Sequence, residues 1–334
     1  MPDSRKVAEM SDYWKKILPW SIQVEVVQGC TRRCGFCGIR GVPREKQLGT
    51  RAIDLALLRN VFEQLNAWMP NGIRVELNSH GEPTLHPEFY EVLHVIRRAM
   101  PKAYITLQTN CEPWFESAIL SLKTMFGCGL NAAILNCYKK GYADFFRNNL
   151  PQYDMPFIDY FHQTGKGESY SSRHSLSKPY IFILDDLSEV NKGGQRGHLN
   201  NKMLHNSGGN SDERILRETY GVKLPALPLK AKCSKVFREI ILGWDGTIPI
   251  CCQDWNDVHV MGNVKSTPIR VLWQSPHWQA VRAILYRRGR DLLEPCRYCS
   301  DPTNRVGLLP DVEQFASLSM DQLVRVIEME IDGF

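Results

Sequence analysis

The sequence predicts an α/β protein whose larger part consists of parallel strand–helix units, followed by a smaller C-terminal domain. In the first two thirds of the chain, strand-like segments rich in β-branched residues alternate with segments of helical periodicity. After about residue 215 the cysteine pattern changes. The 334 residues are 43% hydrophobic and 23% charged, a composition typical of globular proteins. We therefore expect a lead-in helix in residues 1–20, a core in residues 21–215 and a C-terminal domain in residues 216–334.

The individual elements follow from periodicity and flanking residues. Alternating or β-branched runs predict strands at 22–27, 73–78, 103–109, 130–135 and 179–184. Apolar residues at helical spacing predict helices at 51–69, with Thr50 as the cap, at 87–100 and around 113–126. Residues 151–178 and 187–213 are rich in Gly, Ser, Asn and Lys, which favours long loops of the kind that contact substrates.

Charge and hydropathy exclude several classes of protein. The formal net charge of +5 is mild and spread along the chain, so basic pairs such as Arg97-Arg98 and Arg287-Arg288 are interpreted as solvated helix faces. We find no apolar run of about 18 residues and no secretory signal at the N-terminus, which favours a cytoplasmic protein without a membrane partner. In that compartment the 11 cysteines are expected to be reduced, as metal ligands, catalytic groups or core residues.

Three cysteines follow the first predicted strand in the pattern C-x3-C-x2-C: Cys30, Cys34 and Cys37. Three thiolates on one short loop converge on a single metal centre, and they leave one iron of a [4Fe–4S] cluster without a protein ligand. An open coordination position is what a reacting metal centre needs. The alternative is a structural zinc site whose fourth ligand lies elsewhere. Neighbouring arginines would hold the thiolates deprotonated, namely Arg32, Arg33 and Arg40.

This spacing, with the aromatic Phe36 just before the third cysteine, resembles the radical S-adenosylmethionine (SAM) superfamily. The resemblance implies a partial (β/α)6 TIM-like barrel. It also implies a [4Fe–4S] cluster on the three cysteines, whose open iron binds SAM, and it implies that Phe36 lies near the adenine.

Two further segments are similar to motifs of that superfamily. Residues 79–83 (Ser-His-Gly-Glu-Pro) are similar to its G-G-E-P segment, which implies that Gly81, Glu82 and Pro83 bind SAM through its amino group. His80 stands where the family has its first glycine. Asn110 matches the family's T-N-G segment at the end of the third strand, as a SAM or substrate contact or as a capping residue.

Four distant cysteines form a second group: Cys233, Cys251, Cys296 and Cys299. Their spacing, C-x12-G-x4-C and then C-x2-C, is similar to the SPASM or twitch extension of radical SAM enzymes, which binds an auxiliary [4Fe–4S] cluster. The chain lacks the further cysteines of the full SPASM pattern, which favours a shortened form with a single auxiliary cluster. On spacing alone, structural zinc suits the four cysteines as well. Residues 241–254 predict a hairpin that turns at Asp245-Gly246 and presents Cys251 beside Cys233.

Two residues near this hairpin are candidate catalytic groups. Cys252 is a catalytic thiol, an alternative ligand in place of Cys251, or a buried core residue. Asp254 is a general base for a substrate radical or a solvated turn carboxylate. Glu25 on the first strand points either into the barrel or towards the helices.

The resemblance implies a radical SAM enzyme of oxidoreductase or isomerase type. It would cleave SAM reductively to a 5′-deoxyadenosyl radical, with electrons from a flavodoxin or ferredoxin type of donor, and abstract a hydrogen atom from its substrate. A peptide or protein side chain is the first expectation for that substrate. A small molecule, carbohydrate or nucleotide follows, and a nucleic-acid base comes last. Outside this class, the chain would be a zinc-stabilised binding protein without catalysis.

Overall fold

The computed structural model describes residues 17–153, 159–163, 179–184, 204–231, 233–287 and 289–301. The predicted lead-in helix and most of the two predicted long loops lie outside these residues. Among the helices within them, none is both long and apolar enough to cross a membrane.

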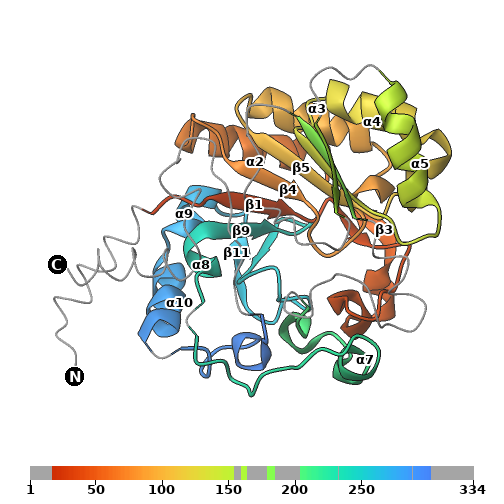
Figure 1. Ribbon diagram of the computed structural model, residues 1–334. Coiled ribbons are helices and arrows are strands. Elements are labelled where there is room, and N and C mark those ends of the chain that lie inside the picture. Colours follow the sequence, from red (N-terminus) through yellow and green to blue (C-terminus); the bar gives the residue numbers. More distant parts are fainter. Residues whose placement is uncertain are drawn as a thin grey trace, which may run out of the picture.

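A seven-stranded sheet, parallel throughout, forms the centre of the molecule (Figure 1). In spatial order its strands are β9 (Glu239–Leu242), β1 (Ser21–Val24), β4 (Arg74–Leu77), β5 (Tyr104–Thr109), β6 (Ala132–Asn136), β8 (Tyr180–Leu184) and β7 (Asp159–Gln163). Within the described residues the sheet is open, because β9 and β7 form its two edges and do not pair with each other. Six of these strands come from residues 21–215, so the predicted partial (β/α)6 fold is confirmed.

The seventh strand, β9, comes from the segment that we assigned to the C-terminal domain. It pairs in parallel with β1, with Ile240 beside Ile22. The main sheet therefore crosses the expected boundary at residue 215, and that boundary stays a prediction. Within the main sheet, the strand that sequence reasoning missed is β7, in a segment without periodicity.

The two faces of the sheet differ in chemistry. Successive residues of a strand point to opposite faces. One face is apolar and lies under helices α2 (Leu55–Trp68), α3 (Phe89–Ala99), α4 (Ala118–Gly127) and α5 (Tyr142–Asn149) (Figure 1). Its fully buried residues include Ile22, Val75, Ile105, Leu107 and Ile181. The opposite, inner face carries Gln23, Glu76, Asn78, Thr106, Gln108 and Asn136.

The cap of the first core helix differs from the prediction. Helix α2 begins after Asp54, whose carboxylate accepts a hydrogen bond from the backbone N–H of Leu57 at 2.8 Å. The expected cap, Thr50, lies instead in β3 (Leu48–Ala52), which pairs with β2 (Val27–Gly29). The prediction was wrong because the β2–β3 pairing extends the chain up to the residue before the helix.

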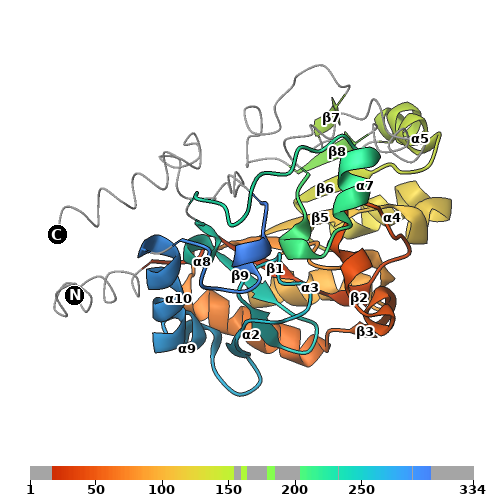
Figure 2. The same cartoon turned by 90° about the horizontal axis from the view of Figure 1, so that it is seen from below.

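The C-terminal segments lie on the side of the sheet away from α3 and α4. Figure 2 views that side, with α7 (Glu213–Glu218) on one flank and α9 (Ile269–Trp273) and α10 (Pro276–Arg287) on the other. The short helix α8 (Lys235–Arg238) leads directly into β9.

The predicted hairpin at residues 241–254 is only partly correct. A turn at Asp245-Gly246 is present, because the Gly243 N–H donates to the Thr247 carbonyl at 2.8 Å. Its two arms, however, belong to different sheets: β9 joins the main sheet, and β10 (Thr247–Pro249) pairs with β11 (Val260–Asn263). Local sequence predicted the turn, and long-range pairing decided the partners of the strands.

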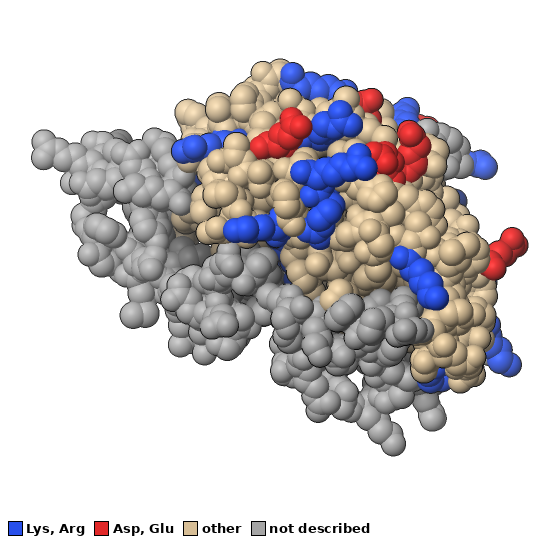
Figure 3. Space-filling model, turned by 90° about the horizontal axis from the view of Figure 1, so that it is seen from above, with Lys and Arg blue, Asp and Glu red and all other residues tan. Residues whose placement is uncertain are grey.

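Basic and acidic side chains are intermingled on the face shown in Figure 3. Arg97, one of the basic residues singled out from the sequence, is tied to the protein: its guanidinium donates to the carbonyls of Pro101, Ala103 and Gly129. Burial lowers the pKa of Arg97. Arg97 therefore holds loops together rather than adding to a nucleic-acid surface.

Candidate active site

A cavity of about 670 Å³ opens at the carboxyl ends of the parallel strands. Residues Asn78, Asn110 and Asn136, which end or follow β4, β5 and β6, line its floor. Residues from the C-terminal third complete the wall, among them Lys235, Cys252, Gln253, Trp255 and Asp301. In open parallel sheets this end is where ligands bind, because the loops that follow the strands converge there.

Cys30, Cys34 and Cys37 line one side of this cavity, as the sequence predicted. Their loop follows β2 and closes on itself, because the Cys37 N–H donates to the Cys34 carbonyl at 3.1 Å. Burial raises the pKa of all three thiols, that of Cys30 to about 11 and that of Cys37 to about 12. The charges of the neighbouring thiolates add to the rise for Cys30 and Cys37.

The arginines near this loop do less than we expected. Arg32 lies beside Cys34 and lowers the pKa of that thiol, but burial outweighs it. The Arg32 guanidinium pairs with Glu112 and lies 4.6 Å from the centre of the Tyr138 ring. Arg33 and Arg40 are exposed. A bound metal would deprotonate the coordinating thiols outright.

Gly81 and Glu82 lie directly against the cysteine loop. Gly81 forms a bridge with Gly29, and the Glu82 N–H donates to the Gly29 carbonyl at 2.8 Å. A Cβ atom on Gly81 would lie 2.4 Å from the Val27 carbonyl oxygen, so only glycine fits this approach. Pro83 follows at the start of a short 3₁₀ helix, Pro83–Leu85.

The buried Glu82 carboxylate fastens the ends of neighbouring strands together. Its Oε1 atom accepts from the hydroxyls of Thr84 and Thr109, at 2.6 and 2.7 Å, and its Oε2 atom accepts from the Asn110 N–H at 2.7 Å. Burial raises the pKa of Glu82 and these donors oppose the rise. Because Oε2 accepts one bond and an oxygen offers two lone pairs, it retains a place for an ammonium donor.

The Asn110 side chain reaches the cysteine loop. Its Nδ2 atom donates to the Thr31 hydroxyl at 3.0 Å and lies 3.5 Å from the Cys30 sulfur. The Oδ1 atom accepts from the Glu112 N–H at 2.9 Å. Asn110 therefore braces the loop as well as lining the cavity.

Phe36 lines the cavity next to two other aromatic rings. It is stacked on Tyr138, with centroids 6.4 Å apart, and meets the edge of Tyr220 at 5.6 Å. Phe36 and Tyr138 both line the cavity and offer apolar ring faces of the kind on which a nucleobase stacks.

The four distant cysteines are buried near one another, and their role as ligands of one cluster stays a prediction. Cys233, Cys251, Cys296 and Cys299 are each less than 10% exposed. Burial, and after it the charges of neighbouring cysteines, raise the pKa of Cys251 and Cys296. For Cys251 these neighbours include Cys233 and Cys296, and for Cys296 they are Cys233 and Cys299. Folding therefore brings near one another cysteines that lie up to 66 positions apart, Cys233 to Cys299.

Three comparisons with known proteins agree with this geometry. The family model of the SPASM iron–sulfur cluster-binding domain matches residues 233–300, the span of the second cysteine group. A SAM-dependent 2-deoxy-scyllo-inosamine dehydrogenase from Niallia circulans is 23% identical over 283 residues, which cover 84% of this chain and 92% of the relative. This chain is a radical SAM enzyme with a SPASM-type domain.

Two solved structures show the same fold as this radical SAM enzyme. The crystal structure of BtrN in complex with AdoMet and 2-DOIA matches with a TM-score of 0.58 and 20% identity, over 91% of this chain and 99% of that one. BtrN in an open conformation matches with a TM-score of 0.53 and 17% identity, over 92% and 98% of the two chains.

Both cysteine groups of the radical SAM enzyme fit iron–sulfur clusters. Within the described residues, no three His, Cys, Asp or Glu side chains close on a single metal-ion position. Thiolates are the protein ligands of iron–sulfur clusters, so the chemistry of both donor sets fits such clusters. When bound, the first cluster and SAM supply a 5′-deoxyadenosyl radical, the species that abstracts a hydrogen atom.

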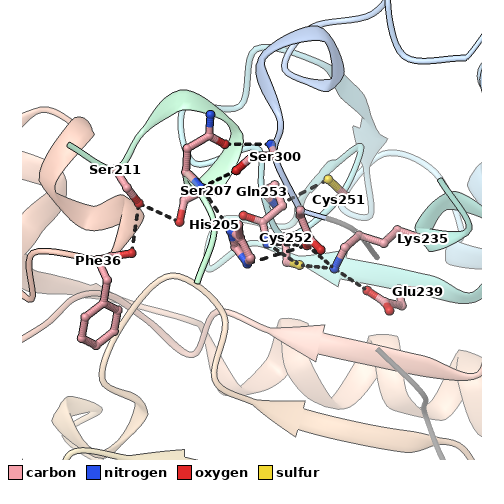
Figure 4. A network of polar contacts seen from close by, with 12 residues as sticks. Phe36, His205, Ser207, Ser211, Lys235, Glu239, Cys251, Cys252, Gln253 and Ser300 are labelled. Atoms are coloured by element: carbon pink, nitrogen blue, oxygen red, sulfur yellow. Dashed lines mark hydrogen bonds and ion pairs between the residues drawn. The ribbon is translucent and has the colours of Figure 1, made fainter. Parts of the chain in front are cut away.

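The structure separates Cys251 from its neighbour Cys252. The Cys251 sulfur faces the other cysteines of the second group and accepts from the Gln253 N–H at 3.4 Å. The Cys252 sulfur lines the cavity, 3.3 Å from the Lys235 ammonium (Figure 4). This placement favours Cys251 as the ligand and leaves Cys252 on the substrate side.

Asp254 has a place that favours a structural role over a catalytic one. It is not among the residues that line the cavity. Its two carboxylate oxygens accept from the N–H groups of Val258 and His259, both at 2.9 Å. Burial raises the pKa of Asp254 to about 6. The Asp254 carboxylate stabilises the turn that follows Cys251 and Cys252 and runs to His259.

A polar cluster in the cavity wall was missed by sequence reasoning. The Lys235 ammonium lies 3.3 Å from an oxygen of Asp301 and 3.7 Å from one of Glu239. Gln253 donates to the same Asp301 oxygen at 3.2 Å, and His205 lies 3.8 Å from it. Figure 4 shows His205, Lys235, Glu239 and Gln253 of this cluster, which come from separate segments of the chain. A lysine two positions after a ligand cysteine was the only local signal for this cluster.

The segment that carries His205 also connects the two cysteine groups. Ser211 donates to the Phe36 carbonyl at 3.0 Å, beside the first group (Figure 4). The Asn206 N–H donates to the Ser300 hydroxyl at 2.8 Å, beside the second group. One short segment thus fixes the distance across the cavity.

His80 likewise joins the two halves of the site. Its Nε2 atom lies 3.0 Å from the Cys252 carbonyl oxygen, and its ring stacks on Trp255 with centroids 4.4 Å apart. Burial lowers the pKa of His80. From the sequence, the single notable feature of His80 was that it replaces the first glycine of the G-G-E-P segment.

Proposed function

We propose that this enzyme oxidises a small hydroxylated molecule by SAM-dependent hydrogen abstraction. The observation that carries the proposal is that one cavity is lined both by the three cysteines of the first group and by the Lys235–Cys252–Asp301 cluster. A substrate held by that cluster lies within the same space as SAM. Cavities of about 300 to 1,000 Å³ are typical of small-molecule sites, and SAM takes part of this volume.

We propose a small-molecule substrate in place of the peptide or protein side chain that was the first expectation from the sequence. The support is the similarity to a dehydrogenase that acts on 2-deoxy-scyllo-inosamine, which extends over 84% of this chain. The C-terminal side of the cavity wall also presents polar groups, Lys235, Gln253 and Asp301, next to the apolar Leu204 and Trp255. A hydroxyl-bearing substrate satisfies such groups, whereas burial without partners is costly.

The proposed oxidation converts a carbinol, H–C–OH, into a carbonyl and removes two electrons and two protons. One hydrogen atom leaves from carbon to the 5′-deoxyadenosyl radical and forms 5′-deoxyadenosine. The hydroxyl proton and one electron leave afterwards. Asp301 and His205 present acceptor atoms for that hydroxyl, and the second cysteine group lies next to Cys252, on the route that the electron would take. An external donor of the flavodoxin or ferredoxin type supplies the electron that cleaves SAM.

Deuterium transfer tests the proposal. Anaerobically reconstituted enzyme is mixed with SAM, dithionite and deuterated candidates from two classes, ring alcohols and peptides. We expect deuterium in 5′-deoxyadenosine, and a carbonyl product, with members of the alcohol class. Deuterium transfer from peptides and from no alcohol would overturn the proposal, and so would failure to form any 5′-deoxyadenosine.

A further inference from the structure

The inner face of the sheet carries a row of carboxamides, one from each of four neighbouring strands. They are Gln23 on β1, Asn78 after β4, Gln108 on β5 and Asn136 at the end of β6, and all four line the cavity. Asn78 donates to the Gln108 oxygen at 3.2 Å, and Gln108 lies 3.5 Å from the Asn136 oxygen. Gln23 lies 3.4 Å from a Glu239 oxygen. We call these four residues the carboxamide row.

The row is not accounted for by the packing of the sheet. Apolar residues fill the opposite face, and on β8 the residue beside Asn136 is the apolar Leu184. Four amides on the concave face have to be hydrogen-bonded to offset their desolvation. Within the row, Asn78 and Asn136 use one donor or acceptor each and Gln108 uses one of each, while Gln23 donates to Glu239. The other donors and acceptors of these amides are left for another partner.

Unpaired polar atoms lie at the same wall. Within the described residues, the Asn78 Oδ1, Ser79 Oγ and Gln253 Oε1 atoms are buried and have no hydrogen-bond partner. All three residues line the cavity. Buried polar atoms without partners are rare in folded proteins, and a cluster of them beside a cavity indicates groups that a ligand satisfies.

The charges of the cavity are paired, which restricts the ligand. Lys235 faces the carboxylates of Asp301 and Glu239, and Arg32 pairs with Glu112. A phosphate or carboxylate needs cations that are available to it. Carboxamides, by contrast, both donate and accept hydrogen bonds without charge, as hydroxyl groups require.

We infer that the carboxamide row binds the hydroxyl groups of a polyhydroxylated ring that carries neither phosphate nor carboxylate. Asn78 and Gln108 at the centre of the row select the hydroxyl pattern. This inference rests on the proposed function and names the substrate class of the same site. It separates cyclitol-like and sugar-like rings from nucleotides and sugar phosphates, which the sequence left together.

The test combines a probe panel with near-isosteric variants. The probes are myo-inositol, glucosamine and glucose 6-phosphate, each with the full-length reconstituted enzyme and SAM, and binding is measured by calorimetry. We expect at least one of the two unphosphorylated rings to bind at least tenfold more tightly than glucose 6-phosphate. Equal or tighter binding of the phosphate, or no binding of either ring, overturns the inference.

The variants Asn78→Leu and Gln108→Met remove the amides and keep most of the volume. Each is expected to weaken binding of the preferred ring by about tenfold, the effect of losing one or two hydrogen bonds. Gln279→Met is the matched control, because Gln279 is a buried glutamine outside the cavity that bonds to the Trp273 carbonyl. Unchanged ring affinity in both row variants overturns the inference. The proposed function stands or falls separately, on deuterium transfer from alcohols.

Discussion

Replacing Glu25 by glutamine should change how the stability of the fold depends on pH. Glu25 directly follows β1 and is 6% exposed, and its Oε2 atom accepts one hydrogen bond, from the Trp244 N–H at 3.4 Å. Burial, as the largest cause, raises the pKa of Glu25 from 4.5 to about 8, and the nearby Asp257 carboxylate adds to the rise. Trp244 and the Lys46 ammonium act in the opposite direction.

The magnitude follows from this difference in pKa. Between pH 4.5 and about pH 8 the folded chain holds a proton that the unfolded chain releases, so stability falls as pH rises through this range. At about 1.4 kcal/mol for each pH unit, the full difference is at most about 5 kcal/mol above pH 8. Glutamine resembles the protonated acid and does not titrate. Glu25→Gln should therefore match the parent at low pH and exceed its stability at high pH.

The assay is denaturant unfolding of the anaerobic protein near pH 5.5 and near pH 8.5, followed by circular dichroism. Glu63→Gln serves as the control, because Glu63 is exposed on helix α2 and should leave the pH dependence as it is in the parent. A stability difference between Glu25→Gln and the parent that is the same at both pH values would refute the reasoning, because the carboxyl group would then not titrate differently in the fold.

Three further outcomes are expected. Cys34→Ala should abolish dithionite-dependent formation of 5′-deoxyadenosine, and continued turnover would remove the first cysteine group from the mechanism. Gly81→Ala should lower the unfolding midpoint and weaken SAM binding, because its Cβ would lie 2.4 and 2.5 Å from carbonyl oxygens of β2, whereas Gly127→Ala, with no atom within 4 Å, should not. Iron analysis should give about eight irons per chain for Cys252→Ser and about four for Cys251→Ser; equal losses would contradict the assignment of Cys251 as the ligand.

Much of the fold was predictable because its signals are local. Five of the parallel strands and three of the core helices were expected from periodicity, and each lies where the pattern placed it to within a few residues. The strand β7 was missed because its segment lacks alternation. The strand β9 was predicted, but as half of a hairpin, since no local pattern reveals that Ile240 pairs with Ile22 across more than 200 residues.

The residues of the candidate site also fall into those that local sequence predicts and those that only the tertiary structure brings together. Ligand spacing is a property of the chain itself, so the two cysteine groups were evident from the sequence. The polar cluster of Lys235, Asp301 and His205 was not, because its members come from three segments that only folding brings together. Asp254 and Cys252 were both candidates by position, and only the direction of each side chain, towards backbone N–H groups or towards the cavity, distinguishes them.

The sequence by itself determined the chemistry of this protein: three thiols that leave an iron open, a glycine–glutamate segment beside them, and four thiols for a second cluster. Those features depend on residue type and spacing along one stretch of chain. Only the tertiary structure decided what the cavity presents to a substrate. Parallel strands place side chains from distant segments in register on one face, so the row of Gln23, Asn78, Gln108 and Asn136 exists only once the sheet has formed.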